Sequence, residues 1–379
     1  MIVEPFKNLL NAELVRASGA ALQRVWPAFE RKHFECVALN NLDALEMKAR
    51  TMQIADALEA TLPQDFDAAC SVIEAALAPP VAADGAASQG DVATRGLSGW
   101  IVWPLGEFVA RRGLGHAERA LRALHALTQR LTAEWAIRPL IATHPQLVFT
   151  TLLAWTRDPS AHVRRLASEG SRPRLPWGLQ LKSLIADPTP TLAILAVLQD
   201  DSSDYVRRSV ANHLNDIAKD HPQLVVDWVR RHLPGATAER RALLLHASRT
   251  LIKQGHADML ALWGAGSVFD GRCTLKVSPK RAVVGDSVAL ALTLQSTSAA
   301  AQSLLIDYAV HHVKANGRTS AKVFKGWRLT LDPGESRTLA KQHSFKAVTT
   351  RRYHAGRHAI EVAINGRAAA HATVQLSLP

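Results

Sequence analysis

Two stretches of this chain, 43 residues apart, carry the same pattern, and this repeat constrains the fold more than any other feature. Asp158–Glu169 reads DPSAHVRRLASE, and Asp201–Asn212 reads DSSDYVRRSVAN. A second motif, HPQLV, occurs at His144–Val148 and again at His221–Val225, 77 residues later. Repeats at such spacings are typical of proteins built from stacked helical units. Because the two spacings differ, the sequence predicts a degenerate helical array rather than a regular one.

Both copies of the longer motif have the apolar spacing of a helix with one buried face. The apolar positions are Val163, Leu166 and Ala167 in the first copy, and Val206, Val210, Leu214 and Ile217 in the second. Arg165 and Glu169, four residues apart, are predicted to share an exposed face. The matching face of the second copy carries Arg208, Asn212 and Asp216. Stacked helices would then present arginines and acids along one groove. The alternative is a solvated ion pair within one helix.

Helical periodicity extends over most of the first 267 residues. Residues 1–77 repeat apolar positions at helical spacing, and residues 117–255 do so with Pro and Asp-Pro punctuation. Between them, residues 78–99 (APPVAADGAASQGDVATRGLSG) are rich in Ala, Gly and Pro and are predicted to form a mobile loop. We therefore expect residues 1–267 to form one mainly α domain, a HEAT-like helical repeat or α-solenoid.

The period of the pattern changes after residue 267. Five segments alternate or are rich in β-branched residues, and PKRAVVGD, DPGE and INGR supply turns. The predicted strands are Cys273–Val277, Ser287–Leu294, Leu304–His311, Ser336–Phe345 and Ala359–Ile364. About seven short strands in roughly 110 residues are typical of an immunoglobulin-like sandwich. Residues 268–379 are therefore predicted to be an all-β domain of this kind.

Basic charge is concentrated in the predicted β domain. Residues 268–379 contain 16 Lys and Arg against 6 Asp and Glu, whereas residues 1–267 contain 29 against 27. A basic domain joined to a nearly neutral helical body indicates a polyanionic partner such as nucleic acid. The competing partner is an anionic membrane surface, but this region has no evident basic amphipathic helix to support it.

Other classes of protein lack their sequence signals in this chain. No apolar run approaches the length of a membrane span, and MIVEPFKNLL lacks the apolar segment of a signal peptide. Cys36, Cys70 and Cys273 are far apart, without metal-ligand spacing, and fit a reducing cytoplasm. The sequence has no glycine-rich phosphate loop either. We therefore expect a cytoplasmic protein with no metal, no cofactor and no membrane attachment.

Three blocks of the helical region together resemble one family of repair enzymes. They are EWAIRPLI from Glu134, HVRRLASEGSRPRLPW from His162 and SVANHLNDIAKDHP from Ser209. The chain resembles the AlkC branch of the AlkC/AlkD alkylpurine DNA glycosylases over about residues 100–260, and some AlkC proteins also carry a C-terminal sandwich domain. The resemblance implies a base excision repair enzyme of the bacterial cytosol, associated with the nucleoid. It implies removal of cationic 3-methyladenine and 3-methylcytosine from double-stranded DNA, and we expect a monomer.

The resemblance also gives candidate active-site residues. The implied positions are the acids Glu134, Glu169 and Asp216, with Trp177 beside them and Arg165 on the DNA backbone. A base methylated at a ring nitrogen leaves as a neutral molecule and needs no general acid. The acids are therefore expected to stabilise the oxocarbenium-like sugar and to orient a water. Trp177 and Trp135 can add a cation–π contact to the base. Trp177 lies in a polar, proline-rich turn, which suits exposure as well as burial.

Basic residues of both domains are candidate DNA contacts, because phosphate contacts position a duplex without reading its sequence. In the groove, these are Arg164, Arg165, Arg172, Arg174 and Arg208. In the β domain, they are Lys322, Lys325, Arg328, Arg351 and Arg352. The second group is predicted to lie near strand ends and loops, where a sandwich presents binding residues. The alternative for this domain is a solubilising module whose charge is spread evenly.

Two other functions are compatible with a helical array, because a fold does not fix a function. The first is a non-catalytic scaffold that binds nucleic acid or a protein through its concave face. Such a scaffold needs the arginines but has no use for several acids among them. The second is an accessory protein that binds RNA. Release of free methylated base from alkylated DNA separates the enzyme from both.

Overall fold

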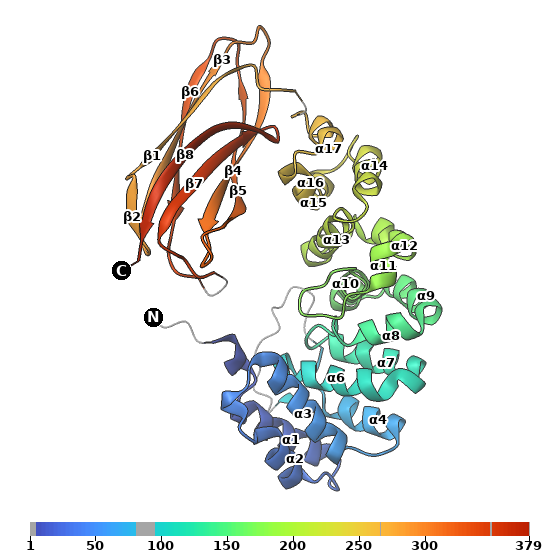
Figure 1. Cartoon of the computed structure of the whole chain (residues 1–379). Helices are drawn as coiled ribbons and strands as arrows, with labels where there is room; N and C mark the ends of the chain where they lie inside the picture. Colours follow the sequence, from blue (N-terminus) through green and yellow to red (C-terminus); the bar gives the residue numbers. More distant parts are fainter. Residues whose placement is uncertain (1–4, 81–94, 266, 349–350, 379) are drawn as a thin grey trace. The chain divides into compact units, whose positions relative to one another are not determined.

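The computed structural model describes residues 5–80, 95–265, 267–348 and 351–378 (Figure 1). Helices form the first part of the chain as far as Leu262, and strands begin at Gly271. The fold is therefore mainly helical with a C-terminal β domain, as predicted. The chain divides into two compact units. The first unit is Met1–His221 with Ala236–Ala247, and the second is Pro222–Gly235 with Ser248–Pro379.

Most of the helices belong to the first unit. Those that precede residue 81 are η1 (Phe6–Leu9), α1 (Ala12–Val25), α2 (Arg31–Leu39), η2 (Leu42–Ala44), α3 (Met47–Thr61) and α4 (Phe66–Ala76). Those that follow residue 94 are η3 (Gly99–Ile101), α6 (Val102–Arg112), η4 (Gly113–Gly115), α7 (Ala117–Thr128), α8 (Ile137–Thr143), α9 (Pro145–Trp155), α10 (Ala161–Glu169), α11 (Lys182–Ala186), α12 (Thr189–Leu198), α13 (Asp204–Ile217) and α15 (Ala238–Ala247). Within the described ranges, no helix is both long enough and apolar enough to cross a membrane.

The two copies of the repeated motif fold alike. Asp158 and Asp201 each accept the backbone N–H two residues later, at 2.8 and 2.9 Å, just before α10 and α13 begin. The first arginine of each VRR sequence, Arg164 or Arg207, donates to the carbonyl oxygen of that aspartate, at 2.9 and 2.6 Å. The apolar stripes are buried as predicted, at Val163, Leu166, Ala167, Val206, Val210, Leu214 and Ile217. The repeat in the sequence therefore encodes the start and the buried face of each helix.

The predicted mobile loop, residues 78–99, falls largely outside the described residues. Backbone hydrogen bonds fix its two described ends, because Ala78 N–H donates to Leu97 O at 3.0 Å and Leu97 N–H donates to Ala76 O at 2.8 Å. A Cβ atom at Gly96 would lie 2.8 Å from Ala76 O, and φ at this position is +102°. The close approach of the two segments therefore requires glycine.

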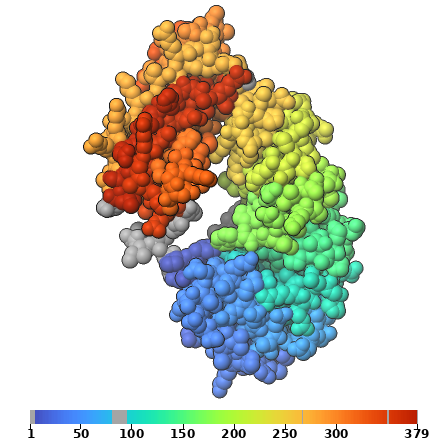
Figure 2. Space-filling view, viewed as in Figure 1, coloured from blue at the N-terminus to red at the C-terminus, as the bar shows by residue number. Residues whose placement is uncertain are grey.

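The strands of the second unit form two sheets that share an apolar core. One sheet has the order β1-β3-β6, with β1 (Gly271–Ser278), β3 (Ser287–Ser296) and β6 (Ser336–Ser344). The other has the order β2-β8-β7-β4-β5, with β2 (Arg281–Val283), β4 (Gln302–Val313), β5 (Thr319–Leu331), β7 (Gly356–Ile364) and β8 (Arg367–Ser377). Leu292 of one sheet and Ile360 of the other are both fully buried in this core, as in a sandwich. These strands make up the orange and red part of the space-filling view (Figure 2).

The five predicted strands are present as β1, β3, β4, β6 and β7, and the structure adds β2, β5 and β8. β5 lies at the edge of its sheet, and its exposed lysines and arginine interrupt the alternation that marks a buried strand. Charged residues are common at such an edge because they prevent pairing with another chain. β8 contains the run Ala368–Ala370, and alanine has a weak strand preference.

Among the described residues, three helices belong to the same unit as the strands. They are α14 (Pro222–His232), α16 (Arg249–Lys253) and α17 (Ala257–Leu262). The turn between α16 and α17 meets the turn between β7 and β8, where a Cβ atom at Gly366 would lie 2.3 Å from Gly255 Cα. Beside it, the Asn365 amide donates to Ser267 O at 2.9 Å. The strands are therefore packed against these helices and not merely tethered to them.

Candidate active site

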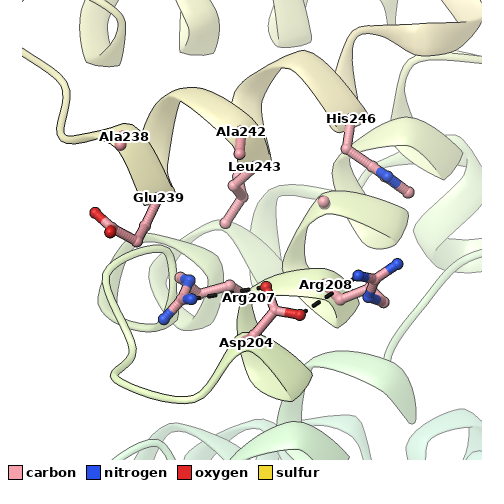
Figure 3. A pocket seen from close by; sticks show the side chains of 9 residues that line it. Asp204, Arg207, Arg208, Ala238, Glu239, Ala242, Leu243 and His246 are labelled. Atoms are coloured by element: carbon pink, nitrogen blue, oxygen red, sulfur yellow. Dashed lines mark hydrogen bonds and ion pairs between the residues drawn. The ribbon is translucent and has the colours of Figure 1, made fainter.

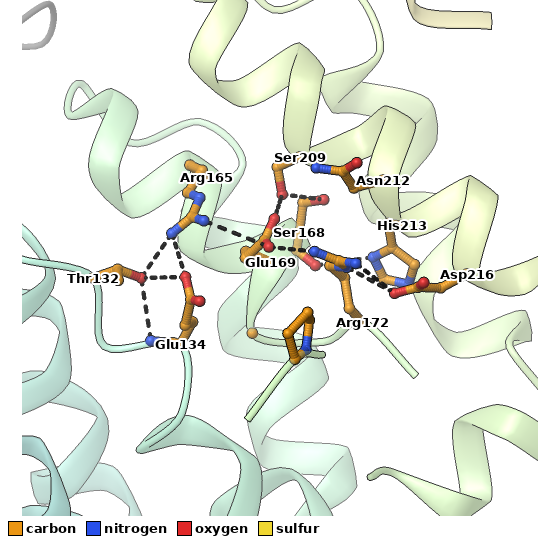
Figure 4. A network of polar contacts seen from close by, with 12 residues as sticks. Thr132, Glu134, Arg165, Ser168, Glu169, Arg172, Ser209, Asn212, His213 and Asp216 are labelled. Atoms are coloured by element: carbon orange, nitrogen blue, oxygen red, sulfur yellow. Dashed lines mark hydrogen bonds and ion pairs between the residues drawn. The ribbon is translucent and has the colours of Figure 1, made fainter. Parts of the chain in front are cut away.

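Charged side chains from α10, α13 and the turn before α8 form a continuous network (Figure 4). Arg165 pairs with Glu134 at 2.5 Å and with Glu169 at 3.5 Å. Arg172, just after α10, pairs with Glu169 at 2.5 Å and with Asp216 at 2.8 Å. The three acids of the sequence prediction thus lie in one network, in which they alternate with arginines. Within the described part of the chain, neither this network nor any other group of His, Cys, Asp and Glu could hold a metal ion.

Glu169 and Asp216 are deeply buried, with only 4% and 1% of their surface exposed. One oxygen of Glu169 faces the two arginines, and the other accepts the Ser209 hydroxyl at 2.6 Å. The oxygens of Asp216 accept from Arg172 and from Lys219, each at 2.8 Å. Burial opposes the ionisation of Glu169, but the two arginines outweigh it and lower the pKa of this carboxyl. Glu169 therefore remains ionised at neutral pH.

Glu134 differs from the other two acids. Its Oε2 accepts from the Thr132 hydroxyl at 2.8 Å and from Arg165, whereas no described residue donates a hydrogen bond to its Oε1. The guanidinium of Arg165 also lies 5.0 Å from the ring centre of Tyr205. Among the described residues, Glu134 is therefore the acid of the network that has an oxygen available to a water or a base.

The structure corrects the prediction that Arg165 and Glu169 share an exposed face and that Asp216 lies on the matching face of the second copy. Both acids are buried, and the Arg165 side chain is only 14% exposed. The reason is that α10 packs against α13, so that Glu169 meets Ser209 across the helix interface. The periodicity of one helix cannot reveal which of its polar residues a neighbouring helix covers. Acids buried in this way are tolerated because their charges are paired.

Besides Arg165, three of the arginines predicted to contact DNA are engaged within the protein. Arg172 is buried, and its donors are taken by the two buried acids. Arg164 pairs with both oxygens of Asp201, at 2.6 and 2.9 Å. Arg174 likewise donates hydrogen bonds to both oxygens of Asp220, each at 2.8 Å, but its side chain is partly exposed. Arg164 and Arg172 are therefore engaged in internal ion pairs, and their contacts with DNA phosphates stay a prediction.

Arg208 is the most exposed of the five arginines, with 65% of its side chain accessible. It lies in a pocket between α13 and α15, where it contacts Asp204 at 3.4 Å (Figure 3). Arg207, Glu239, Leu243 and His246 also line this pocket. Arg165 and Arg208 occupy matching repeat positions, but Arg165 is drawn into the network while Arg208 faces solvent. Arg208 is therefore the best placed of the set to meet a phosphate.

Trp135 and Trp177 belong to a cluster of aromatic rings beside the network. Trp135 directly follows Glu134, and its ring stacks on Trp103 with centroids 4.2 Å apart. Trp103 is also parallel to Trp177, with 2° between the planes and 6.1 Å between the centroids. Phe6 contacts Trp177 at 5.6 Å. Trp177 is 60% exposed, so of the two possibilities that the sequence left open, exposure and burial, the structure shows exposure.

The basic residues of the β domain lie in two places. Three of them are within the edge strand β5, at Lys322, Lys325 and Arg328. The prediction that these three lie near strand ends and loops is wrong, because β5 itself was not predicted. Arg351 and Arg352 do lie between β6 and β7, and Arg351 Nη1 is 2.6 Å from His312 Nε2. Arg351 is half-buried, and the other four cations are exposed.

Several residues of the network were not predicted from the sequence. Ser209 had a detectable signal, because it occupies the position of Leu166 in the first copy and interrupts an apolar stripe. His213, one turn further along α13, is fully buried, and its Nδ1 lies 2.9 Å from Ser168 O. Burial lowers the pKa of His213 to about 4, so the ring is neutral. Nothing in the sequence distinguishes Thr132 from other threonines.

Two family models match this chain. Residues 130–251 match the DNA alkylation repair enzyme family, and residues 272–378 match the C-terminal Ig-like domain of the uncharacterised protein YhaZ. The uncharacterized protein YhaZ of Bacillus subtilis (strain 168) is 36% identical over 364 residues. This match covers 95% of the present chain and 96% of YhaZ.

A solved structure is similar over almost the whole chain. It is the alkylpurine DNA glycosylase AlkC of Pseudomonas fluorescens, bound to DNA that contains an abasic site analog. The TM-score is 0.88 at 35% sequence identity, and the match covers 99% of the present chain and 100% of AlkC. The helical region that carries the three acids and the β domain are both part of this similarity. The chain therefore belongs to the AlkC and YhaZ family of DNA alkylation repair proteins.

Proposed function

We propose that this protein is a DNA glycosylase that releases cationic alkylated bases, 3-methyladenine and 3-methylcytosine, from duplex DNA. The observation that carries the proposal is the network of Glu134, Glu169 and Asp216 among arginines. A surface that only binds nucleic acid needs the cations alone, and acids beside them weaken the attraction to phosphate. The similarity to AlkC supports this chemistry, because an abasic site is what base removal leaves in DNA.

In this mechanism, the carboxylates act on the sugar and on water rather than on the leaving base. The methylated base departs as a neutral molecule, while positive charge develops on the sugar as the glycosidic bond breaks. Ionised carboxylates stabilise this oxocarbenium-like state. Glu134 is our candidate for the group that orients the attacking water, because its Oε1 accepts no hydrogen bond from any described residue. Glu169 pairs with Arg165, which in turn pairs with Glu134, and Asp216 acts one step further away by pairing with Arg172 beside Glu169.

The network does not act by net negative charge. Its three acids face Arg165, Arg172 and Lys219, so that the formal charges cancel. The attraction for a cationic base is therefore local, set by the free oxygen of Glu134 and by the exposed indole of Trp177. A cation–π contact with Trp177 is worth about 0.5–2 kcal/mol, depending on how completely water is removed.

We further propose that the helical region is a HEAT-like array and that both units hold the DNA duplex. Arg208 is the candidate for a phosphate contact in the helical unit, because its guanidinium is largely exposed. In the β domain, the row of cations along β5 and the pair between β6 and β7 provide further phosphate contacts. The protein acts as a monomer, without metal or cofactor.

The direct test is release of free base from methylated duplex DNA. The purified chain is incubated with the duplex, and free 3-methyladenine and 3-methylcytosine are quantified by chromatography. Release with multiple turnovers supports the proposal, whereas tight binding without release indicates the scaffold function. An RNA duplex of the same sequence, tested in parallel, distinguishes a DNA enzyme from an RNA-binding accessory protein.

A further inference from the structure

Trp177 combines two features that are unfavourable for folding alone. Its φ is +64°, in the left-handed region, which costs a bulky residue about 1–2 kcal/mol. Its indole is also mostly exposed to solvent. Such a conformation persists only where the surroundings enforce it, and these positions cluster at functional sites. The residues that enforce the conformation of Trp177 are therefore of interest.

Arg138 of α8 is the main contact that holds this loop. Its fully buried side chain donates to four carbonyl oxygens, those of Gly170 at 2.8 Å, Arg172 at 2.7 Å, Pro173 at 3.4 Å and Leu179 at 2.5 Å. These acceptors lie on both sides of Trp177 in the sequence, so one guanidinium fixes both ends of the loop. The loop approaches so closely that a Cβ atom at Gly178 would lie 3.1 Å from Arg138 Cδ.

The contacts of Arg138 are unusual for a buried arginine, because it forms no ion pair with any described acid. Burial and the neighbouring Arg172 lower the pKa of Arg138 to about 10, so it remains protonated at neutral pH. An apolar side chain at this position would avoid the burial of a charge but would leave the loop carbonyls unsatisfied. The same loop carries Arg172, whose side chain bridges Glu169 and Asp216. Arg138 thus connects the Trp177 loop to the acid network.

Trp135 provides an additional point of attachment for the loop. Its Nε1 donates to Pro176 O at 3.1 Å, immediately before Trp177. Its ring stacks on Trp103, which is parallel to the indole of Trp177. The exposed indole therefore lies beside the rings of Trp103 and Phe6, and the residue before it accepts a hydrogen bond from Trp135. The position of Trp177 is fixed before any ligand binds.

We propose that Arg138 is a positioning residue, which holds Trp177 as a preformed surface for the alkylated nucleotide beside the acids. This role rests on the proposed glycosylase function, whereas the holding of the loop does not. A preformed indole is already ordered when DNA binds, so the complex avoids the entropy cost of fixing it. Arg138 touches no substrate in this scheme and acts through Trp177.

The first test is hydrogen exchange of the free protein. In Arg138→Lys the charge remains, but one nitrogen cannot reach carbonyls at both ends of the loop. We expect the amides of residues 172–181 to exchange at least about tenfold faster than in the wild type, because local opening becomes easier. The control is Arg130→Lys, since Arg130 also donates to backbone carbonyls, those of Ala78 and Ala126. Unchanged exchange of the loop in Arg138→Lys would overturn the proposal.

The second test is a double-mutant cycle on the single-turnover rate of base release. If Arg138 acts through Trp177, Arg138→Lys and Trp177→Ala each slow release, and the double variant is no slower than Trp177→Ala. Additive losses would overturn the proposal. They would mean that Arg138→Lys slows base release by a route that does not involve Trp177, such as a general loss of folding. If Arg138→Lys does not fold, Gly178→Ala replaces it in both tests, because its Cβ would lie 3.1 Å from Arg138 Cδ and disturb the same contact between Arg138 and the loop. If the wild type releases no base, the glycosylase function fails, and the exchange experiment still decides whether Arg138 holds the loop.

Discussion

Replacement of Glu134 by Gln removes one charge from the network and almost nothing else. The amide oxygen of Gln can still accept from Thr132 and Arg165, and Arg165 keeps its pairing with Glu169. A carboxylate about 5 Å from a full positive charge on the sugar would contribute about 3 kcal/mol at an effective dielectric constant of 20. The substrate is already a cation, so only the shift of charge from base to sugar counts. The 3 kcal/mol is therefore an upper limit, and we expect base release to slow by about 10-fold to 10²-fold, or about 1.4–2.7 kcal/mol.

The assay is single-turnover base release at saturating enzyme, with DNA affinity and thermal unfolding measured on the same samples. A matched control is Glu74→Gln, because Arg119 lies between Glu74 and Asp67 as Arg165 lies between Glu134 and Glu169. Both variants lose one charged partner of a shared arginine, and we expect a loss of stability of about 1–3 kcal/mol for the buried Glu134 and a smaller loss for the more exposed Glu74. Only Glu134→Gln should slow release. Equal rates in the two variants would refute the role of Glu134.

Four further predictions follow from the structure. Asp216→Asn should lower the free energy of unfolding in urea by about 3–5 kcal/mol, because the buried Arg172 loses one of its two charged partners. An unchanged midpoint of urea unfolding would contradict this. Arg208→Ala should reduce the dependence of log Kd on log salt by about one unit, whereas an unchanged slope would remove Arg208 from the interface. Replacement of the three β5 cations by Gln should weaken DNA binding more than replacement of three exposed cations in and just after β1, Arg272, Lys276 and Lys280, and equal effects would indicate evenly spread charge. The free energy of unfolding should fall as the pH drops from about 6.5 towards 4, by up to about 1.4 kcal/mol per pH unit for His213. In this range the His213 ring is protonated in the unfolded chain but neutral in the folded protein. A free energy of unfolding that does not change between pH 7 and 5 would contradict this.

Local features of the fold could be predicted from the sequence, because they depend on residues close together in the chain. The apolar stripes of α10 and α13 and five of the strands follow from periodicity alone. β5 did not, because an edge strand has no strict alternation of buried and exposed residues. The start of each repeated helix follows from its aspartate and its first arginine, whose contacts lie within six residues.

The site was harder to predict, because its geometry depends on contacts between helices. The resemblance gave Glu134, Glu169 and Asp216, but it did not indicate that two of them are buried. That burial arises where α10 packs on α13 and where Arg172 returns towards both acids after its helix has ended. The role of Arg138 had no signal either, because its four acceptors are backbone carbonyls and any sequence supplies those.

Comparison of the two repeat copies shows which positions make the same contact in both copies and which do not. Arg164 and Arg207 make the same bond to the carbonyl of the preceding aspartate, so this position serves the helix start in both copies. The next position does not behave alike, because Arg165 is paired with acids while Arg208 is exposed. The two positions differ in the acids around them, since Arg165 meets Glu134 and Glu169, whereas the second copy has Asn212 in place of Glu169 and Arg208 contacts the exposed Asp204. Matching positions of the repeat can therefore have different contacts, and in the proposed function Arg165 belongs to the acid network while Arg208 meets a phosphate.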